Sequence, residues 1–478
     1  MKKILVWLRN DLRLHDNTLL HEATQKSEQV WVAYCIDKRL FAPNMLGIPK
    51  TGNFRAKFLT ESLLDLRLQL RKQGSDLIVR LGKPEQEICK IAEILQVEAV
   101  FTSKEVTQEE LEVETALEQN LTSKGIAIEY FWQATLYHIN DLPFPVCKLP
   151  DIFTEFRKAV ERQVEIRKPL PAPNKKISPL PENLFAGNIP TLKEVGLQEV
   201  EISPKATFIF KGGETEALKR LHYYLWESDL IASYKETRNG LLGKDYSSKF
   251  SPYLALGCIS PRQIWQEVKK YEKERTANES TYWLIFELIW RDFFRFTAKK
   301  YGNRLFYPSG FKNEKLALAE NTEIFWKWAK GETGVPFIDA NMRELNATGF
   351  MSNRGRQNVA SFLVKDLKIS WIWGATYFES LLIDYDVCSN WGNWQYVAGV
   401  GNDPRENRYF NIISQAERYD SQAEFMKHWL PELQNVPSKK INYLGELSAK
   451  ELAEYGVRIG VNYPKAIVKW TLAVKVSK

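Results

Sequence analysis

The chain changes its pattern part-way along, and this change limits the folds open to it more than any other feature. The first 135 residues alternate short apolar runs with amphipathic stretches. Residues 211–478 instead carry apolar residues at helical spacing, and they hold 12 of the 15 tryptophans. Short apolar runs of this kind are typical of strands buried on both faces of a parallel sheet. We therefore expect an α/β domain followed by an all-α domain.

Five apolar runs are the candidate strands, at residues 4–8, 30–36, 76–81, 99–102 and 126–131. Between them we predict helices over 54–73, from Pro84 onward, and from a capping-box pattern of Thr107 and Glu110 to a stop at Gly125. This alternation favours a doubly wound parallel sheet. No GxGxxG follows the first strand, which argues against the usual dinucleotide-binding loop.

Residues 136–210 contain ten prolines, which favour a connector over the surface without long helices. The predicted parts are therefore 1–135, a connector over 136–210 and a helical domain over 211–478. No stretch is apolar enough for a membrane span, and the first residues do not form a signal peptide, so we expect a cytoplasmic protein. The five cysteines are scattered, which argues against a disulfide framework and a metal site. The net charge of +7 is only a mild bias toward polyanions.

Two of five polar segments have a structural interpretation that we favour. The first, residues 9–17, is dense in paired charges directly after the first strand, and it suits a strand-end turn or a contact between domains. The second, residues 245–252, places hydroxyl groups before a proline-started helix. An N-cap is its simplest explanation, and a phosphate site is the alternative.

The other three segments combine charged or amide side chains with aromatic residues. Glu287 and Arg291 stand four residues apart, which suits either an intrahelical ion pair or a cavity with Trp290 beside a stacked base. Residues 352–358 place two arginines in a first helical turn, where they oppose the helix dipole and need an anionic partner. Residues 384–394 mix carboxylates and amides with tryptophans, so they form either a polar core network or a flavin site.

In this order the segments resemble the photolyase/cryptochrome family, most closely its DASH branch. The resemblance rests on residues 7–17, 234–239, 251–257, 353–358 and 384–394, and it extends over nearly the whole chain. It implies a Rossmann-like α/β domain and a helical domain that holds one U-shaped FAD. The residues that it assigns to FAD are Tyr234, Ser247, Ser248, Lys249, Phe250, Ser251, Arg291, Arg356, Asp384, Asp386 and Asn390. Asn390 stands where photolyases place an asparagine that faces flavin N5.

The implied activity is blue-light-driven repair, in which excited FADH⁻ donates an electron to a flipped-out cyclobutane pyrimidine dimer. The catalytic residues would be Glu287, Trp290, Asn390, Trp394 and Trp371. The nucleic-acid contacts would be Arg238, Glu287, Trp290, Asn353, Arg354, Gln357, Tyr396 and Arg408. Gln357 and Tyr396 replace a methionine and a tryptophan of the usual lesion pocket, which implies a preference for single-stranded DNA. RNA is a further candidate substrate.

The resemblance also implies a tryptophan relay that reduces the flavin. Trp394 and Trp371 match its inner members, but Leu318 stands at the place of the surface member, with Trp326, Trp328 and Trp373 as candidate substitutes. Gln108 and Glu109 match contacts of a 5,10-methenyltetrahydrofolate antenna. We expect a monomer. The alternatives are a photoreceptor that regulates transcription by binding DNA without repair, and a flavin or folate reservoir.

Overall fold

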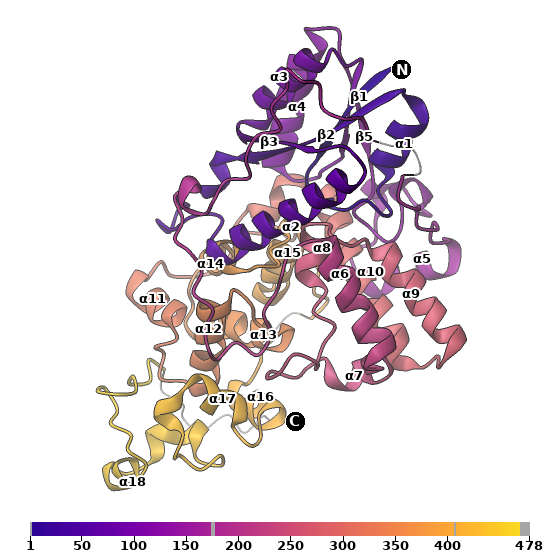
Figure 1. The fold of residues 1–478 in the computed structure, drawn as a ribbon. Helices are drawn as coiled ribbons and strands as arrows, with labels where there is room; N and C mark the ends of the chain where they lie inside the picture. Colours follow the sequence, from indigo (N-terminus) through magenta and orange to yellow (C-terminus); the bar gives the residue numbers. More distant parts are fainter. Residues whose placement is uncertain (1, 174–176, 406–407, 469–478) are drawn as a thin grey trace.

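Five parallel strands form the centre of the N-terminal half in the computed structural model, which describes residues 2–173, 177–405 and 408–468 (Figure 1). The strands are β1 (Lys3–Leu8), β2 (Gln29–Asp37), β3 (Leu77–Gly82), β4 (Ala99–Ser103) and β5 (Ala127–Phe131). They lie in the order β3-β2-β1-β4-β5, with every neighbouring pair parallel. The predicted doubly wound sheet is confirmed, and β1, β2 and β4 are buried because helices cover both faces.

The helices of this half are α1 (Thr18–Lys26), α2 (Asn53–Lys72), α3 (Pro84–Leu95) and α4 (Gln108–Thr122). Pro84 occupies the first turn of α3, as predicted. The capping box predicted at the start of α4 is wrong. The hydroxyl of Thr107 donates directly to the carboxylate of Glu110 and does not accept from the helix backbone. The helix still begins at the expected place.

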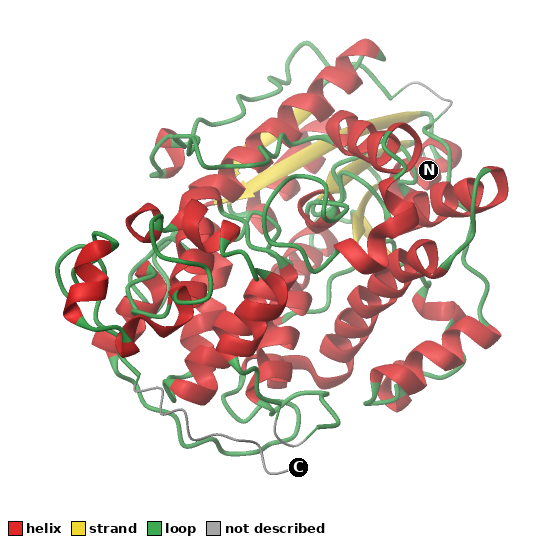
Figure 2. Ribbon diagram, turned by 90° about the horizontal axis from the view of Figure 1, so that it is seen from below, coloured by secondary structure: helices red, strands yellow, loops and turns green. Residues whose placement is uncertain are grey.

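In the described part of the second half the regular elements are all helices, and Figure 2 shows the strands confined to the other half. Its helices are α6 (Glu214–His222), α7 (Tyr234–Thr237), α8 (Ser251–Ala255), α9 (Pro261–Glu274), α10 (Glu279–Tyr301), α11 (Thr322–Lys330), α12 (Pro336–Thr348), α13 (Asn353–Ser361), α14 (Trp371–Leu381), α15 (Val387–Ala398), α16 (Ile412–Tyr419), α17 (Glu424–Trp429) and α18 (Ala449–Glu454). Five-residue π turns extend α6 and α13, at Tyr223–Glu227 and Phe362–Asp366. The 23-residue α10 begins with a capping box at Asn278, and most of its residues are buried.

The connector contains a helix that the proline count did not predict. Helix α5 (Phe153–Gln163) buries Phe153, Phe156 and Val160 on one side. It forms because the prolines stop at Pro150 and resume at Pro169, which leaves a stretch long enough for three helical turns. The expectation of a segment without long helices is therefore wrong for this stretch.

Residues 9–17 join the sheet to the helical half, which supports their interpretation as a domain contact. The guanidinium of Arg13 donates to the carbonyl of Gly257 at 2.9 Å, and Asp16 forms a 2.7 Å ion pair with Arg262. Gly257 has φ +64°, and a Cβ atom there would lie 2.1 Å from the carbonyl oxygen of Asn10. Only glycine permits this close approach of the two backbones.

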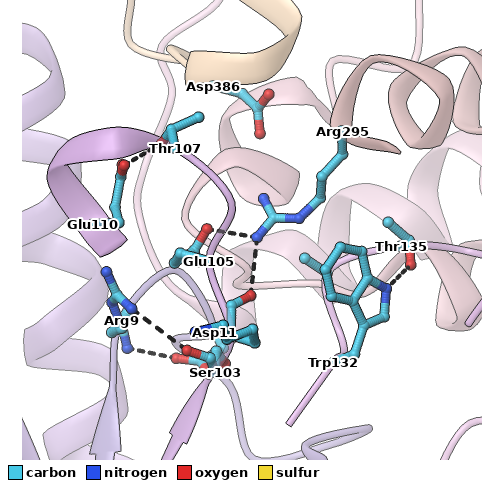
Figure 3. A network of polar contacts seen from close by, with 12 residues as sticks. Arg9, Asp11, Ser103, Glu105, Thr107, Glu110, Trp132, Thr135, Arg295 and Asp386 are labelled. Carbon is cyan, nitrogen blue, oxygen red and sulfur yellow. Dashed lines mark hydrogen bonds and ion pairs between the residues drawn. The ribbon is translucent and has the colours of Figure 1, made fainter. Parts of the chain in front are cut away.

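A buried carboxylate on α10 fixes the start of the connector. Asp292 accepts hydrogen bonds from the backbone N–H groups of Leu136 and Tyr137 at 2.9 and 2.8 Å. Burial raises the pKa of Asp292 to about 7, although these donors and nearby arginines oppose the rise. On the next turn, Arg295 pairs with Glu105 of the loop before α4 at 2.5 Å (Figure 3). These contacts hold α10 against the sheet.

Candidate active site

The candidate site is a cavity of about 480 Å³ between the 234–251 segment, α10, α13 and α15. A second cavity of about 110 Å³ continues it toward α14 and shares Arg356, Asp384 and Asp386 with it. This volume lies in the range of small-molecule and cofactor sites, roughly 300–1,000 Å³. One end is lined by hydroxyl and cationic side chains, and the inner end by apolar and amide groups together with the charged Arg356, Asp384 and Asp386.

The polar end is a loop held by an arginine that the sequence analysis missed. The guanidinium of Arg220 donates to the carbonyls of Lys244, Ser247 and Ser248 at 3.0–3.1 Å, and it pairs with Asp245 at 3.2 Å. The loop is thereby folded so that residues 247–251 line the cavity. Nothing local marks Arg220 in the sequence, because its partners lie more than 20 residues away.

Lys249 places a buried amino group at this end of the cavity. Its ammonium lies 3.4 Å from the ring centre of Tyr246 and 4.5 Å from that of Phe350. Burial lowers the pKa of Lys249 to about 7, and burial raises the pKa of nearby Glu344 to about 8. The hydroxyl of Tyr246 is buried without a hydrogen-bond partner among the described residues. A cation and an unpaired donor in this position suit an anionic ligand group such as a phosphate.

Arg356 and Asp384 form the ion pair at the centre of the site. Nη2 of Arg356 lies 3.0 and 2.8 Å from the two carboxylate oxygens of Asp384, and Nε donates to the carbonyl of Met351 at 2.9 Å. The side chain of Asp384 is 2% exposed and that of Arg356 is 25% exposed. Arg356 therefore has the carboxylate partner that its position in the first turn of α13 demanded.

Arg291 takes part in this site, but not in the ion pair proposed for it. Arg291 donates to the carbonyls of Ala134 and Leu254, and its Nη2 lies 3.7 Å from Oδ2 of Asp386. Glu287 instead pairs with Arg238 at 2.5 Å. The interpretation of Glu287 and Arg291 as an intrahelical ion pair is therefore wrong. Burial alone would raise the pKa of Asp386, but the cations of Arg291 and Arg295 hold it below its usual value.

Asn390 borders the inner cavity together with Trp394 and Phe378. Its Nδ2 donates to the carbonyl of Ala375 at 3.1 Å, which fixes the amide and leaves Oδ1 as a free acceptor. Asn390 as a whole is 8% exposed. The amide thus presents a neutral acceptor next to the charged Arg356 and Asp384.

The outer end of the cavity carries Glu287 and Trp290. Burial raises the pKa of Glu287, and the cation of Arg238 opposes this shift. Trp290 stacks on Phe153 of the connector helix, with ring centres 3.6 Å apart and planes at 10°. Phe153 therefore fixes the indole plane from behind.

Two polar side chains complete the outer wall, and each has a cationic partner. The hydroxyl of Tyr396 accepts from Arg408 at 3.0 Å, and Arg408 also pairs with Asp403. Gln357 accepts from Arg354 at 3.0 Å. Among the described residues Arg354 has no carboxylate partner; it donates to Asn239 at 2.9 Å and covers the ring of Tyr419. The prediction that both arginines of residues 352–358 need an anionic partner is therefore confirmed for Arg356 and wrong for Arg354 among the described residues.

The structure gathers nearly all predicted site residues around these two cavities. Those on the larger one are Tyr234, Arg238, Ser247, Ser248, Lys249, Phe250, Ser251, Glu287, Trp290, Arg291, Asn353, Arg356, Gln357, Asp384, Asp386, Tyr396 and Arg408. Asn390 and Trp394 border the smaller one. Within the described residues, Arg354 and Trp371 border neither cavity.

A separate cavity of about 470 Å³ lies at the carboxyl ends of β2 and β4, between the sheet and the helical half. Gln108 and Glu109 line it, together with Lys50, Arg55 and Glu379. Lys50 pairs with Glu109, and Nη1 of Arg55 is buried with no hydrogen-bond partner in the part of the chain that the structure describes. The carboxyl edge of a parallel sheet is the usual place for a ligand in an open α/β fold.

Comparison with known proteins identifies the family. Residues 4–174 match the family model described as DNA photolyase, and residues 283–477 match the FAD binding domain of DNA photolyase. The chain is 52% identical to cryptochrome DASH of Xenopus laevis over 468 residues, which cover 97% of this chain and 89% of that protein. The crystal structure of a cryptochrome from Synechocystis sp. PCC6803 superposes with a TM-score of 0.95 at 51% identity, over 98% of this chain and 97% of that one. The chain belongs to the cryptochrome DASH family.

A cryptochrome DASH chain therefore combines the DNA photolyase fold with a photolyase-type FAD-binding domain. A class III photolyase from Agrobacterium tumefaciens shares this fold with a TM-score of 0.85 at 28% identity, over 98% of this chain and 95% of that one. In the described part of this cryptochrome DASH chain, no helix is long and apolar enough to cross a membrane. The described residues also contain no group of three metal-binding side chains.

Proposed function

We propose that the protein uses blue light and reduced FAD to split cyclobutane pyrimidine dimers, preferentially in single-stranded DNA. The strongest support is that one cavity is lined both by residues that suit a cofactor and by residues that suit a nucleic-acid base. Its inner part has the Arg356–Asp384 pair, and its outer part has Glu287 and Trp290. A cofactor at the inner end and a base at the outer end would be in contact.

The residues present fit a flavin nucleotide. Lys249 and the serines of the 247–251 loop would hold the phosphates, and the hydroxyl of Tyr246 would gain the partner that it lacks among the described residues. Arg356 would face the ring edge with its charge balanced by Asp384. Oδ1 of Asn390 would accept the N–H at flavin N5 without adding a negative charge. Bound and reduced, FAD would supply the electron that light releases to the dimer.

Glu287 and Trp290 would recognise the dimer itself. Burial favours the protonated form of Glu287, the form that can donate a hydrogen bond to a pyrimidine carbonyl, and the Arg238 cation opposes this shift. Arg238 holds this carboxyl in place. The indole of Trp290, fixed from behind by Phe153, offers an aromatic wall to the flipped bases.

Gln357 and Tyr396 support the preference for single strands. Both are tied to arginines by hydrogen bonds, so the outer wall is more polar than an aromatic or thioether wall. A polar wall stacks less strongly on a base, and stacking is worth about 1–3 kcal/mol per base. Extraction from a duplex costs a few kcal/mol, which a single strand avoids.

Strand preference can be tested with the double variant Gln357→Met/Tyr396→Trp. We expect this variant to gain roughly tenfold in duplex repair relative to single-strand repair, since a stronger stacking wall offsets part of the unpairing cost. The measurement is the initial rate of thymine-dimer repair in matched single-stranded and duplex oligonucleotides. Tyr307→Phe, at an exposed site away from the cavity, is the control. An unchanged ratio would show that these two residues do not set the preference.

We further propose that the cavity at the sheet edge holds 5,10-methenyltetrahydrofolate as an antenna. Carboxylates such as Glu109 suit the amino and N–H groups of a pterin, and Arg55 suits the glutamate tail. Tyr385 and Asp386 border this cavity and the smaller flavin-side cavity, so a folate here would lie close to the flavin.

The variant Gln108→Ala/Glu109→Ala tests the antenna. Loss of charge-assisted hydrogen bonds, each worth about 1.5–3 kcal/mol, should weaken folate binding at least about tenfold. Near-ultraviolet absorption of folate retained after gel filtration measures this loss, and Glu118→Ala on the exposed side of α4 is the control. Equal retention by the variant and the control would rule out the assignment.

A further inference from the structure

The aromatic side chains next to Trp394 form a path to the surface that avoids Trp371. The ring of Trp394 contacts Trp328 of α11, with centres 6.3 Å apart, and Phe378 of α14, with centres 5.1 Å apart. Trp328 has no exposed surface. It lies 6.0 Å from Tyr377, which in turn lies 6.1 Å from Trp326.

Phe325 provides a second connection between the same two tryptophans. Its ring centre lies 5.7 Å from Trp328 and 5.3 Å from Trp326. Trp326 is partly exposed, whereas its neighbours in this cluster are buried. The chain Trp394–Trp328–Trp326 therefore runs from the inner cavity to solvent through aromatic contacts.

The other branch ends at an aliphatic side chain. The backbone of Ala319 bonds to Lys368 and Ser370 at 2.7 and 3.2 Å, which places residue 318 beside the start of α14 and near Trp371. Leu318 cannot be oxidised at potentials that oxidise an indole. The ring of Trp371 contacts Trp391, and Trp391 borders the sheet-edge cavity that we assign to the antenna. This branch therefore leads back into the protein.

We propose that Trp328 and Trp326 are the outer members of the relay that reduces the flavin in this chain, an assignment that rests on the proposed FAD site. Bound oxidised FAD, when excited by light, would take one electron from Trp394, and electrons from Trp328 and then Trp326 would restore the indole of Trp394 in turn. Trp326 loses its indole proton to water and becomes a neutral radical. A solvent thiol returns a hydrogen atom to Trp326 and becomes a thiyl radical. Two such passages would supply the two electrons of reduced FAD, whose proton comes from water, and the two thiyl radicals that they leave combine as a disulfide.

The hydrogen bonds along the path favour this endpoint. Nε1 of Trp328 donates to the carbonyl of Val359 at 3.1 Å. A peptide carbonyl is too weak a base to take the indole proton. The radical cation of Trp328 therefore keeps its proton and is reduced by Trp326. The hydroxyl of Tyr377 donates to Oδ1 of Asn346 at 2.7 Å, and burial raises the pKa of Tyr377. An amide oxygen is too weak a base to remove this proton, so Tyr377 serves as a spacer.

The test is the rate of thiol-dependent flavin photoreduction in blue light. Trp326→Phe and Trp328→Phe should each lose most of this rate while they keep bound FAD and the wild-type circular dichroism. Leu318→Trp in the Trp326→Phe background should restore the rate, because it supplies an indole beside Trp371. Trp265→Phe on α9 is the control and should photoreduce like the wild-type protein.

A second readout locates the radical. After illumination in oxygen, peptide mass spectrometry should find the oxidised indole at Trp326 in the wild-type protein. Wild-type photoreduction by Trp326→Phe, or oxidation confined to Trp371 and Trp391, would overturn the assignment. Dimer repair by dithionite-reduced Trp326→Phe should equal that of the wild-type protein, because the relay is then bypassed. If the dithionite-reduced wild-type protein repairs nothing, the proposed function fails, while the relay is still judged by photoreduction.

Discussion

Replacing Arg356 by methionine should lower the free energy of unfolding by about 3–5 kcal/mol, because it leaves a buried carboxylate without its partner. The side chain of Asp384 is 2% exposed, and Arg356 is the residue that forms an ion pair with it. The same variant should lose FAD during gel filtration. The denaturant midpoint of the flavin-free protein and the flavin absorbance of the purified protein measure the two effects.

A second substitution separates stability from cofactor binding. In Arg356→Met/Asp384→Leu both charges are gone, so most of the lost stability should return, as it does when apolar residues replace a buried ion pair. FAD should remain absent. Lys327→Met breaks an exposed pair with Glu323 on α11 and should change stability by less than about 1 kcal/mol. If Arg356→Met unfolds like this control, the central ion pair does not stabilise the site.

Trp290→Ala should weaken the binding of dimer-containing single strands by about 1–3 kcal/mol, or roughly 5–150-fold, which is the range for loss of one base–aromatic stack. Binding of undamaged oligonucleotide should change less, because its bases stay outside the cavity. Fluorescence anisotropy with matched damaged and undamaged strands measures both affinities.

Trp290→Phe is the matched control for this prediction. It keeps an aromatic ring above Phe153, whose ring centre lies 3.6 Å from the indole, and should retain most of the discrimination between damaged and undamaged strands. If Trp290→Ala binds both strands with wild-type affinity, Trp290 is a core side chain and not a wall of the lesion pocket.

Local pattern was enough to predict the five strands of the sheet and three of the four helices α1 to α4 in the N-terminal half. The runs at 4–8 and 99–102 differ from β1 and β4 by one residue at one end, because a strand buried on both faces is apolar over nearly its whole length. Helix α5 was missed because the proline content was averaged over 136–210. The prolines flank 151–168 and do not interrupt it.

Interactions between distant residues could not be predicted in this way. The spacing of Glu287 and Arg291 suggested an ion pair, but Arg238 comes from 49 residues away and pairs with Glu287 instead. Arg220, which folds the loop around the polar end of the cavity, has no local signal at all. The pairing of Arg356 with a carboxylate followed from the helix dipole, but its identity as Asp384 came only from the resemblance.

The most direct test of the central claim is a single-turnover repair experiment. Dithionite-reduced protein is bound to a single strand that carries one thymine dimer, and restored thymines are counted after blue-light flashes and after the same time in darkness. We predict dimer splitting in the light and none in the dark. Absence of splitting in the light, with reduced FAD and oligonucleotide both bound, would contradict the account.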